Sequence, residues 1–156
     1  MRFRMIVVGK TRVSYLCEGE EDYLKRLKQY CKFEIQHVKS EKIKDSIAEN
    51  HIRNCEGERI LKLVSQRSTV VAMDTRGETM SSEELARKVA DWQDRGIPEV
   101  VFLIGGPLGL SNAVLSRANY IFSLSRMTLT HEMARLILLE QLYRSFTILR
   151  GEKYHK

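Results

Sequence analysis

The sequence predicts an α/β fold with a mainly parallel sheet and helices on both faces of that sheet. Short segments rich in Val, Ile and Phe alternate along the chain with longer segments rich in Glu, Lys and Leu. The segment EVVFLIGG at 99–106 is a continuous apolar run, which is typical of a parallel strand buried on both faces. With 156 residues and a hydrophobic content of 43%, the chain can bury one core, and we expect residues 1–156 to form a single domain.

Five segments have the composition of strands, and the segments between them favour helices. The expected strands are residues 2–9, 33–39, 69–74, 99–106 and 120–125. The expected helices include 13–31, 41–66 with a break at 56–57, and a short helix at 112–117. A turn is expected at 75–77. Ser81 and Glu84 then form a capping-box pattern that opens a helix to Arg95, and Gly96 and Pro98 end it.

The last helix begins near Thr130, a residue type that caps helices well, and His131 falls in its first turn. At 100° per residue this helix is apolar on two sides. The main apolar side carries Leu136, Leu138, Leu139, Leu142, Tyr143, Phe146 and Leu149. The second side carries Met133, Ala134, Ile137 and Ile148. One side suffices to pack on a sheet, so we expect the second to form a homodimer interface; a fully internal helix is the alternative. Arg135 lies within the main apolar side, where we expect it to pair with a carboxylate or to face an anionic ligand.

The charge of the chain is positive and unevenly distributed. The formal net charge is +6, and residues 117–156 hold seven Arg and Lys against three Glu. A basic segment of this kind is compatible with a polyanionic substrate such as RNA, and equally with a solvated basic surface.

Several function classes lack their sequence motifs. The chain holds no GxxxxGK[ST], HExxH or GxSxG motif, and Cys17, Cys31 and Cys55 have neither disulfide nor zinc spacing, so we expect no metal. Its apolar runs are far shorter than the roughly 20 residues that cross a bilayer. The opening MRFRMIVVGK is no signal peptide. We therefore expect a cytoplasmic protein without membrane contact.

The ends of the last two expected strands carry the candidate site, because open α/β sheets bind ligands at the carboxyl ends of their strands. Gly105 and Gly106 allow unusual backbone angles and the close approach of a ligand, although a plain tight turn closed by Pro107 explains them as well. The segment at 124–129 mixes apolar and polar residues before the last helix. Asp74, at the end of the third strand, is expected to cap a turn.

Four segments resemble the RlmH family of SPOUT-superfamily (α/β-knot) methyltransferases. They are MIVVGK (5–10), FLIGGPLGLS (102–111), LSRMTLTHEMAR (124–135) and LLEQLYRSFTILRGEKYHK (138–156). The resemblance implies a C-terminal trefoil knot, a homodimer, S-adenosylmethionine as methyl donor, and methylation of N3 of a pseudouridine in 23S (large-subunit) ribosomal RNA on assembled ribosomes. The chain departs from the family pattern at Thr130, where members often have Pro, and at Leu108, where many have a polar residue.

The resemblance also assigns site residues. The implied cofactor-binding residues are Met73, Gly105, Leu124, Ser125, Arg126, Met127, Thr128 and Leu129. The tail residues Tyr154, His155 and Lys156 match the family's ending, which is implicated in RNA recognition and catalysis.

A mechanism for this implied reaction can be written from the chemistry of these residues. N3 of a uracil ring is protonated at neutral pH, so a base must remove or share that proton. His155, with an ordinary pKa of about 6.5, suits a general base, and Lys156 or Arg135 would stabilise the developing anion or hold phosphate. A non-catalytic RNA-binding dimer and a nucleotide-binding module are the alternative functions.

Overall fold

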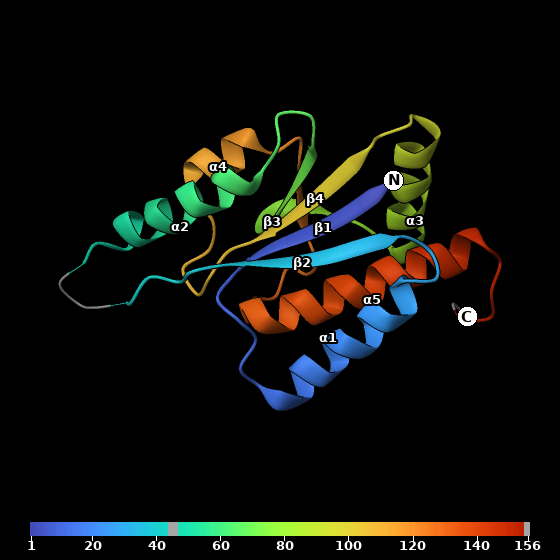
Figure 1. Cartoon of the computed structure of the whole chain (residues 1–156), viewed down its shortest axis with the longest axis horizontal. Helices are drawn as coiled ribbons and strands as arrows, with labels where there is room; N and C mark the ends of the chain where they lie inside the picture. The colour runs from blue at the N-terminus through green and yellow to red at the C-terminus, as the bar shows by residue number, and fades with distance from the viewer. Residues whose placement is uncertain (44–46, 155–156) are drawn as a thin grey trace.

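The computed structural model describes residues 1–43 and 47–154 and contains a five-stranded sheet (Figure 1). The strands are β1 (Arg2–Val8), β2 (Lys32–Val38), β3 (Thr69–Thr79), β4 (Glu99–Ile104) and β5 (Tyr120–Ser123). Their order is β2-β1-β4-β3-β5, and neighbouring strands run parallel, as predicted. The helices are α1 (Ser14–Leu27), α2 (Glu49–Leu63), α3 (Ser82–Asp94), α4 (Asn112–Arg117) and α5 (His131–Leu149).

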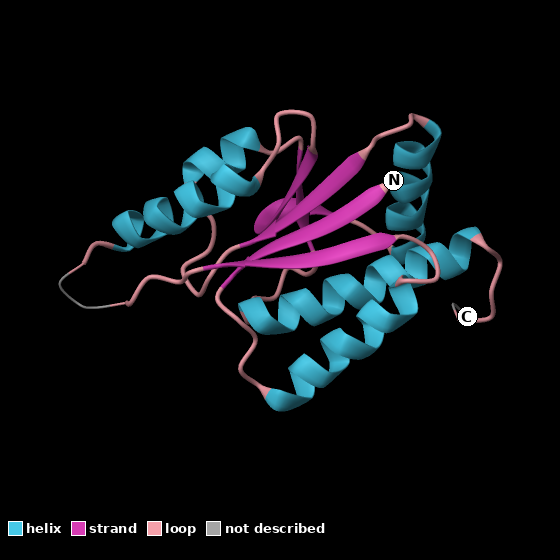
Figure 2. Ribbon diagram, viewed as in Figure 1, coloured by secondary structure: helices cyan, strands magenta, loops and turns pink. Residues whose placement is uncertain are grey.

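Helices cover both faces of the sheet, which confirms the predicted layering (Figures 1 and 2). Helices α1, α3 and α5 pack on one face and α2 and α4 on the other. Alternate side chains of β1 divide between the two cores: Phe3 and Met5 contact the first group, and Ile6 and Val8 the second. All four are almost fully buried, as expected for a central parallel strand.

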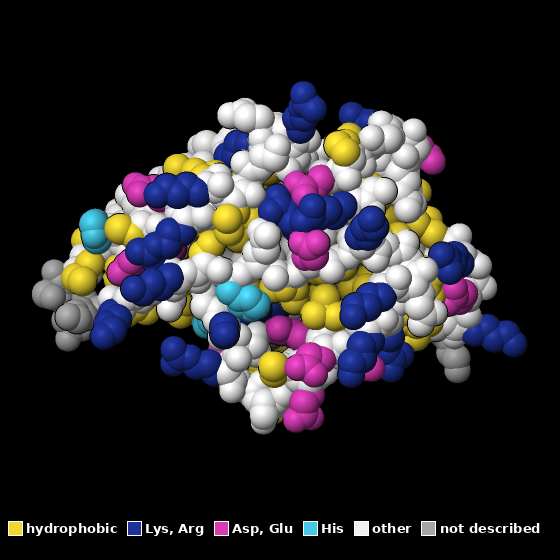
Figure 3. Space-filling view, viewed as in Figure 1, with side chains coloured by type: hydrophobic (Ala, Val, Ile, Leu, Met, Phe, Trp, Pro, Cys, Tyr) yellow, Lys and Arg dark blue, Asp and Glu magenta, His cyan; other side chains and the backbone are white. Residues whose placement is uncertain are grey.

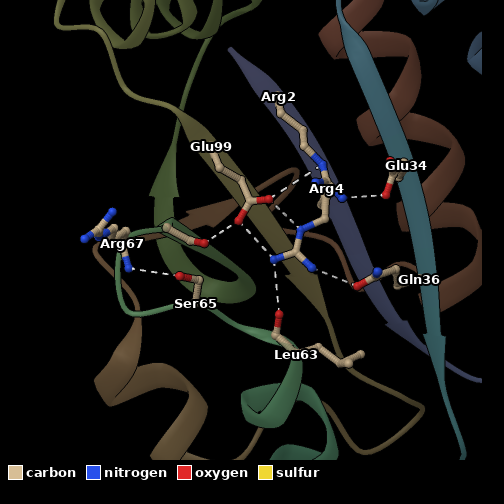
Figure 4. A network of polar contacts seen from close by, with 9 residues as sticks. Arg2, Arg4, Glu34, Gln36, Leu63, Ser65, Arg67 and Glu99 are labelled. Carbon is tan, nitrogen blue, oxygen red and sulfur yellow. Dashed lines mark hydrogen bonds and ion pairs between the residues drawn. The ribbon is translucent and has the colours of Figure 1, made fainter.

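A polar cluster joins the amino ends of the strands, at the edge opposite to the carboxyl ends (Figure 4). Arg4 Nε lies 2.8 Å from Glu99 Oε1, and the Ser68 hydroxyl donates to the same carboxylate. Arg4 also donates to the Leu63 carbonyl at 3.1 Å and to Gln36 Oε1 at 2.8 Å. This cluster ties β1, β2, β4 and the end of α2 together.

Helix α2 differs most from its prediction. It begins at Glu49 instead of residue 41 and continues through Gly57 without the expected break. The described part of the loop before it is held away from helix geometry, because the Glu41 N–H donates to Glu56 Oε1 at 2.9 Å. Gly57 lies inside the helix because it packs against the Ser111 side chain, where an added Cβ atom would clash. Residues 44–46 lie outside the described part.

Strand β3 is also longer than predicted. Instead of ending at 74 before a turn, it continues to Thr79 with an irregular register, because Met73 and Glu78 both pair with Phe122 of β5. The intervening residues therefore bulge out of the sheet. The short helix α4 and the capping box of Ser81 and Glu84 agree with the predictions.

Helix α5 is covered on both flanks by its own chain. It packs on the sheet between α1 and α3, and Leu136 on one flank reaches Gly19 of α1. Ile137, on the other flank, shares a small cavity with Leu85 of α3. Leu136 and Ile137 remain partly exposed. The two-sided apolar pattern is thus largely explained within one chain, and the homodimer stays a prediction.

Candidate active site

A cavity of about 750 Å³ opens at the carboxyl ends of β3, β4 and β5. Three segments form its walls: the glycine turn (residues 105–109), the β3 bulge (residues 73–76) and the connecting segment between β5 and α5 (residues 124–130). Its volume lies within the usual range for small-molecule sites. Its place is the one at which open α/β sheets bind ligands.

The glycine turn owes its shape to the close approach of two backbone segments. A Cβ atom added at Gly105 would lie 2.5 Å from the Gly109 carbonyl carbon, so no side chain fits there. Gly109 adopts φ 83°, and its N–H donates to the Gly106 carbonyl at 2.9 Å. Among the described glycines of this turn, only Gly109 has a positive φ, and Gly105 is required because of the close approach of the Gly109 backbone.

Helix α2 supports the glycine turn from behind. Arg53 donates to the Leu108 carbonyl at 3.4 Å. Glu56 is 3% exposed, and an added Cβ atom at Gly106 would lie 3.1 Å from Glu56 Oε2. Burial raises the pKa of Glu56, and the hydrogen bond from the Glu41 N–H and the charge of Arg59 only partly offset this.

The β3 bulge places a charged pair at the cavity. Asp74 accepts hydrogen bonds from the Arg76 backbone N–H at 2.9 Å and from Arg76 Nε at 2.8 Å, so it holds the backbone of the β3 bulge. The hydrogen bond from the Arg76 side chain lowers the pKa of Asp74, so this carboxylate is ionised at neutral pH. Asp74, Thr75 and Arg76 all line the cavity.

Hydrogen bonds of Ser123 and Ser125 to residues two positions away bend the connecting segment. Ser123 Oγ donates to the Ser125 carbonyl at 2.8 Å, and the Met127 N–H donates to Ser125 Oγ at 3.0 Å. Thr130 ends the segment as the N-cap of α5, because its hydroxyl accepts from the Met133 N–H at 3.2 Å. Met127 is 75% exposed. Backbone polar groups and apolar side chains thus alternate along this wall, a composition that suits a heterocyclic ligand.

His131 follows at the first position of α5 and also lines the cavity. Burial lowers its pKa, as does the charge of Arg135, while Glu132 acts in the opposite direction. The imidazole is therefore neutral at pH 7. The sequence pattern predicts only a structural role for His131 at the start of a helix; the structure places it beside the cavity, because the carboxyl ends of β4, β3 and β5 lie next to one another at this edge.

The structure brings together most of the residues that the sequence assigned to the cofactor. Seven of them line the cavity: Met73, Gly105, Leu124, Ser125, Met127, Thr128 and Leu129. The eighth, Arg126, is exposed and is not part of the cavity wall. The cavity also includes residues that were not predicted, among them Arg76, Phe122 and Ala134.

Arg135 lies behind the cavity wall and is fully buried. It donates to the Val8 carbonyl at 2.6 Å and to Thr11 Oγ1 at 3.1 Å, and Thr11 in turn donates to Glu20 Oε1 at 2.6 Å. Of the two expected partners, a carboxylate or an anionic ligand, no carboxylate among the described residues lies within ion-pair distance, because the Thr11 hydroxyl stands between Arg135 and Glu20; the anionic ligand stays a prediction. Burial lowers the pKa of Arg135, and the charges of Glu20 and Glu132 oppose this.

Tyr154 packs against the middle of α5, at Glu140 and Tyr143, whereas the cavity lies at the start of this helix. Its hydroxyl lies 3.2 Å from that of Tyr23 and donates to Glu140 Oε1 at 3.1 Å, and its ring packs on Tyr143. Helix α5 has 19 residues and is therefore about 28 Å long. The structure does not bring Tyr154 to the cavity of its own chain, and His155 and Lys156 lie outside the described residues.

A family model described as predicted SPOUT methyltransferase matches residues 1–155. The chain belongs to this family. It is 46% identical over its full length to the "Ribosomal RNA large subunit methyltransferase H" of Desulfotalea psychrophila, and 46% identical to the protein of the same name from Acetivibrio thermocellus, with 100% of each relative covered.

Solved structures of other proteins share the fold at low sequence identity. A probable methylase family protein from Haemophilus influenzae superposes with a TM-score of 0.56 at 18% identity, over 99% of this chain and 70% of that one. A methyltransferase from Legionella pneumophila, solved with bound S-adenosylmethionine, superposes with a TM-score of 0.52 at 11% identity, over 94% of this chain and 66% of that one.

Two further features bear on function. Within residues 1–43 and 47–154, no three His, Cys, Asp or Glu side chains come together as a metal site would require. In the same residues, no helix has the length and apolar character to span a membrane.

Proposed function

We propose that this SPOUT methyltransferase transfers a methyl group from S-adenosylmethionine to N3 of a pseudouridine in 23S (large-subunit) ribosomal RNA. The observation that carries the proposal is the cavity at the carboxyl ends of β3, β4 and β5, in a chain nearly half identical to rRNA methyltransferases along its whole length. The net charge of +6 fits an RNA substrate. Action on ribosomes also implies the cytoplasm. The trefoil knot and the single domain remain predictions.

The cavity fits S-adenosylmethionine by its size and by its chemistry. Met73, Leu124 and Leu129 offer apolar contacts to an adenine ring, and backbone N–H and C=O groups of the connecting segment face its polar edge. Gly105, where no side chain fits, leaves room for close backbone contact. When bound, S-adenosylmethionine supplies an electrophilic methyl group.

The protein's own groups must orient the acceptor base and manage its proton. Transfer to N3 requires that this nitrogen lose its proton, and we propose His155 as the base that accepts it. Lys156 would stabilise the negative charge that develops on the ring. Arg135, buried behind the wall, fixes the end of β1 and the start of α5 in place and acts as a positioning residue.

The place of the tail supports a homodimer. Tyr154 is anchored at Glu140 and Tyr143, about 14 to 18 Å along α5 from His131 at the cavity, and two further residues span at most about 7 Å. This separation favours a site that is completed between two chains. If the tail takes part in catalysis, it serves the cavity of a second copy.

The proposal is tested with labelled S-adenosylmethionine and ribosomes that lack the modification. We expect methyl transfer to assembled ribosomes and none to an isolated RNA hairpin, because so small a protein offers little surface for reading sequence and would recognise a preformed ribosomal surface. Efficient methylation of the hairpin would contradict the ribosome requirement, and no transfer to either substrate would contradict the function.

His155 is tested by single-turnover methylation at saturating ribosome concentration. We expect His155→Ala to slow this step by about 10²-fold, the usual contribution of a general base. An unchanged rate would exclude His155 as the base.

A further inference from the structure

The loop between β1 and α1 (residues 9–13) leaves the sheet directly beside the cavity. Val8, the last residue of β1, packs against the glycine turn: an added Cβ atom at Gly106 would lie 3.2 Å from Val8 Cγ1. The loop then passes the start of α5, whose first residues line the cavity (Figure 1). The loop therefore runs beside the residues that form the cavity wall, without itself lining the cavity.

The backbone of this loop is held rigidly by buried and half-buried groups of α1 and α5. Arg135 donates to the Val8 carbonyl and to Thr11, and Thr11 donates to the buried Glu20. Glu132 Oε2 accepts the N–H groups of Arg12 and Val13 at 3.2 and 3.3 Å. Glu20 and Glu132 thus accept hydrogen bonds from the Thr11 hydroxyl and from backbone N–H groups of the loop, and not from the side chains of Lys10 or Arg12.

Lys10, Arg12 and Val13 are the exposed residues of the loop, and Lys10 and Arg12 are its two cations. Within the described part of the chain, no carboxylate lies within ion-pair distance of either cation. After burial, the charges of Arg135 and Lys10 lower the pKa of His37. Other Lys and Arg side chains gather on the same face over α2 (Figure 3).

We propose that Lys10 and Arg12 bind backbone phosphates of the substrate RNA beside the cofactor cavity. This deepens the proposed function and depends on it, since it assigns the RNA-docking surface of the same site. A rigid loop holds both cations in place before binding, so little order is lost when the phosphates bind. Arg12 can bind a phosphate through two N–H groups, and Lys10 acts as a point charge.

The test is the affinity for ribosomes as a function of salt, for wild type and for Lys10→Ala/Arg12→Ala. Loss of two phosphate contacts should raise the Kd about tenfold or more at low salt and flatten the slope of log K against log [KCl] by roughly 1.5 to 2. Lys10→Arg, which keeps the charge, should retain most of the affinity.

A matched control removes two exposed cations at the opposite edge of the sheet. Lys28 and Lys32 lie near the amino end of β2, so Lys28→Ala/Lys32→Ala should leave the Kd and the salt slope unchanged, although the net charge falls equally. Calorimetry with S-adenosylmethionine reports on the cavity separately, and Lys10→Ala/Arg12→Ala should bind it like wild type.

Three outcomes would overturn this assignment alone. The first is that the salt slope of Lys10→Ala/Arg12→Ala is unchanged while the wild type binds and methylates ribosomes. That result would leave the proposed function intact. The second is an equal loss in the control variant, which would mean that only the net charge matters. The third is loss of S-adenosylmethionine affinity in Lys10→Ala/Arg12→Ala, which would make the loop part of the cofactor site. A wild type without affinity for ribosomes would overturn this assignment and the proposed function together.

Discussion

Glu56 of α2 lies directly behind Gly106 of the glycine turn, with Oε2 3.1 Å from the position that a Cβ atom of residue 106 would take. The other oxygen, Oε1, accepts the Glu41 N–H from the loop that precedes α2. One buried carboxylate therefore connects that loop with the wall of the cavity.

Alanine at the two glycines should have unequal effects. Gly105→Ala meets the backbone of Gly109 at 2.5 Å, which cannot yield without deforming the turn, whereas Gly106→Ala meets only the side chains of Glu56 and Val8. We expect Gly105→Ala to weaken S-adenosylmethionine binding by more than about tenfold, and Gly106→Ala by clearly less. Calorimetry measures both, and equal affinities would contradict this account of the turn.

Glu56 should give a pH-dependent contribution to stability. Its pKa is raised in the folded protein, so its contribution is fully present below the unfolded pKa and is lost as the pH rises through the folded value. Glu56→Gln should remove this loss, so urea unfolding should show the stability of the variant rising relative to wild type as the pH increases above 4.5, the ordinary pKa of a glutamate. Glu56→Ala leaves the Glu41 N–H without its acceptor and should cost about 1 to 2 kcal/mol. A constant difference between Glu56→Gln and wild type would contradict the pKa shift.

Glu99, at the amino edge of the sheet, should behave in the opposite way. Burial alone would raise its pKa, but the hydrogen bonds from Ser68 and Arg4 and the charges of Arg4 and Arg2 lower it. Its contribution is present above the unfolded pKa and is lost as the pH falls through the folded value. Glu99→Gln should cost about 2 kcal/mol at pH 7, and this cost should shrink below about pH 4.5.

Glu34→Gln is the matched control for this cluster. Glu34 pairs with Arg2, but its side chain is 53% exposed, and exposed ion pairs contribute little. If Glu34→Gln lowers the free energy of unfolding as much as Glu99→Gln does, burial is not what makes the ion pairs of this cluster stabilising.

The homodimer can be tested by complementation between two defective chains. Gly105→Ala impairs the cavity and His155→Ala impairs the tail, so at subsaturating S-adenosylmethionine each homodimer should be much less active than wild type. Co-expressed and purified as mixed dimers, they should regain up to about half of the wild-type activity per mixed dimer, because one intact cavity meets one intact tail. No recovery in verified mixed dimers would contradict a site shared between chains.

The sequence predicted the parallel sheet and the position of the cavity at the strand ends because both depend on local patterns. The family resemblance supplied the set of residues expected to bind the cofactor. Apolar runs such as 99–106 identify buried strands, and the ends of such strands meet at one edge. Residues at those ends, including Gly105 and Leu124, could therefore be placed in one cavity. The capping residues Ser81 and Thr130 marked two helix starts correctly for the same local reason.

The predictions that failed depend on contacts distant in sequence. Helix α2 starts late because Glu41 is bound by Glu56, and β3 bulges because two of its residues pair with Phe122. For Arg135 the sequence pattern left a carboxylate and an anionic ligand as possible partners. It does not reveal that the hydroxyl of Thr11, 124 residues away, lies between Arg135 and Glu20. No periodicity in the sequence encodes such pairings.

The most direct test of the central claim is nucleoside mass spectrometry of large-subunit ribosomal RNA. The purified protein, S-adenosylmethionine and unmodified ribosomes are incubated together, and the RNA is digested and fragmented. We predict one added methyl group, located on N3 of a single pseudouridine, and its absence when Gly105→Ala replaces the wild type. A methyl group on another nucleoside, or an unchanged RNA in the presence of bound cofactor, would contradict the proposed function.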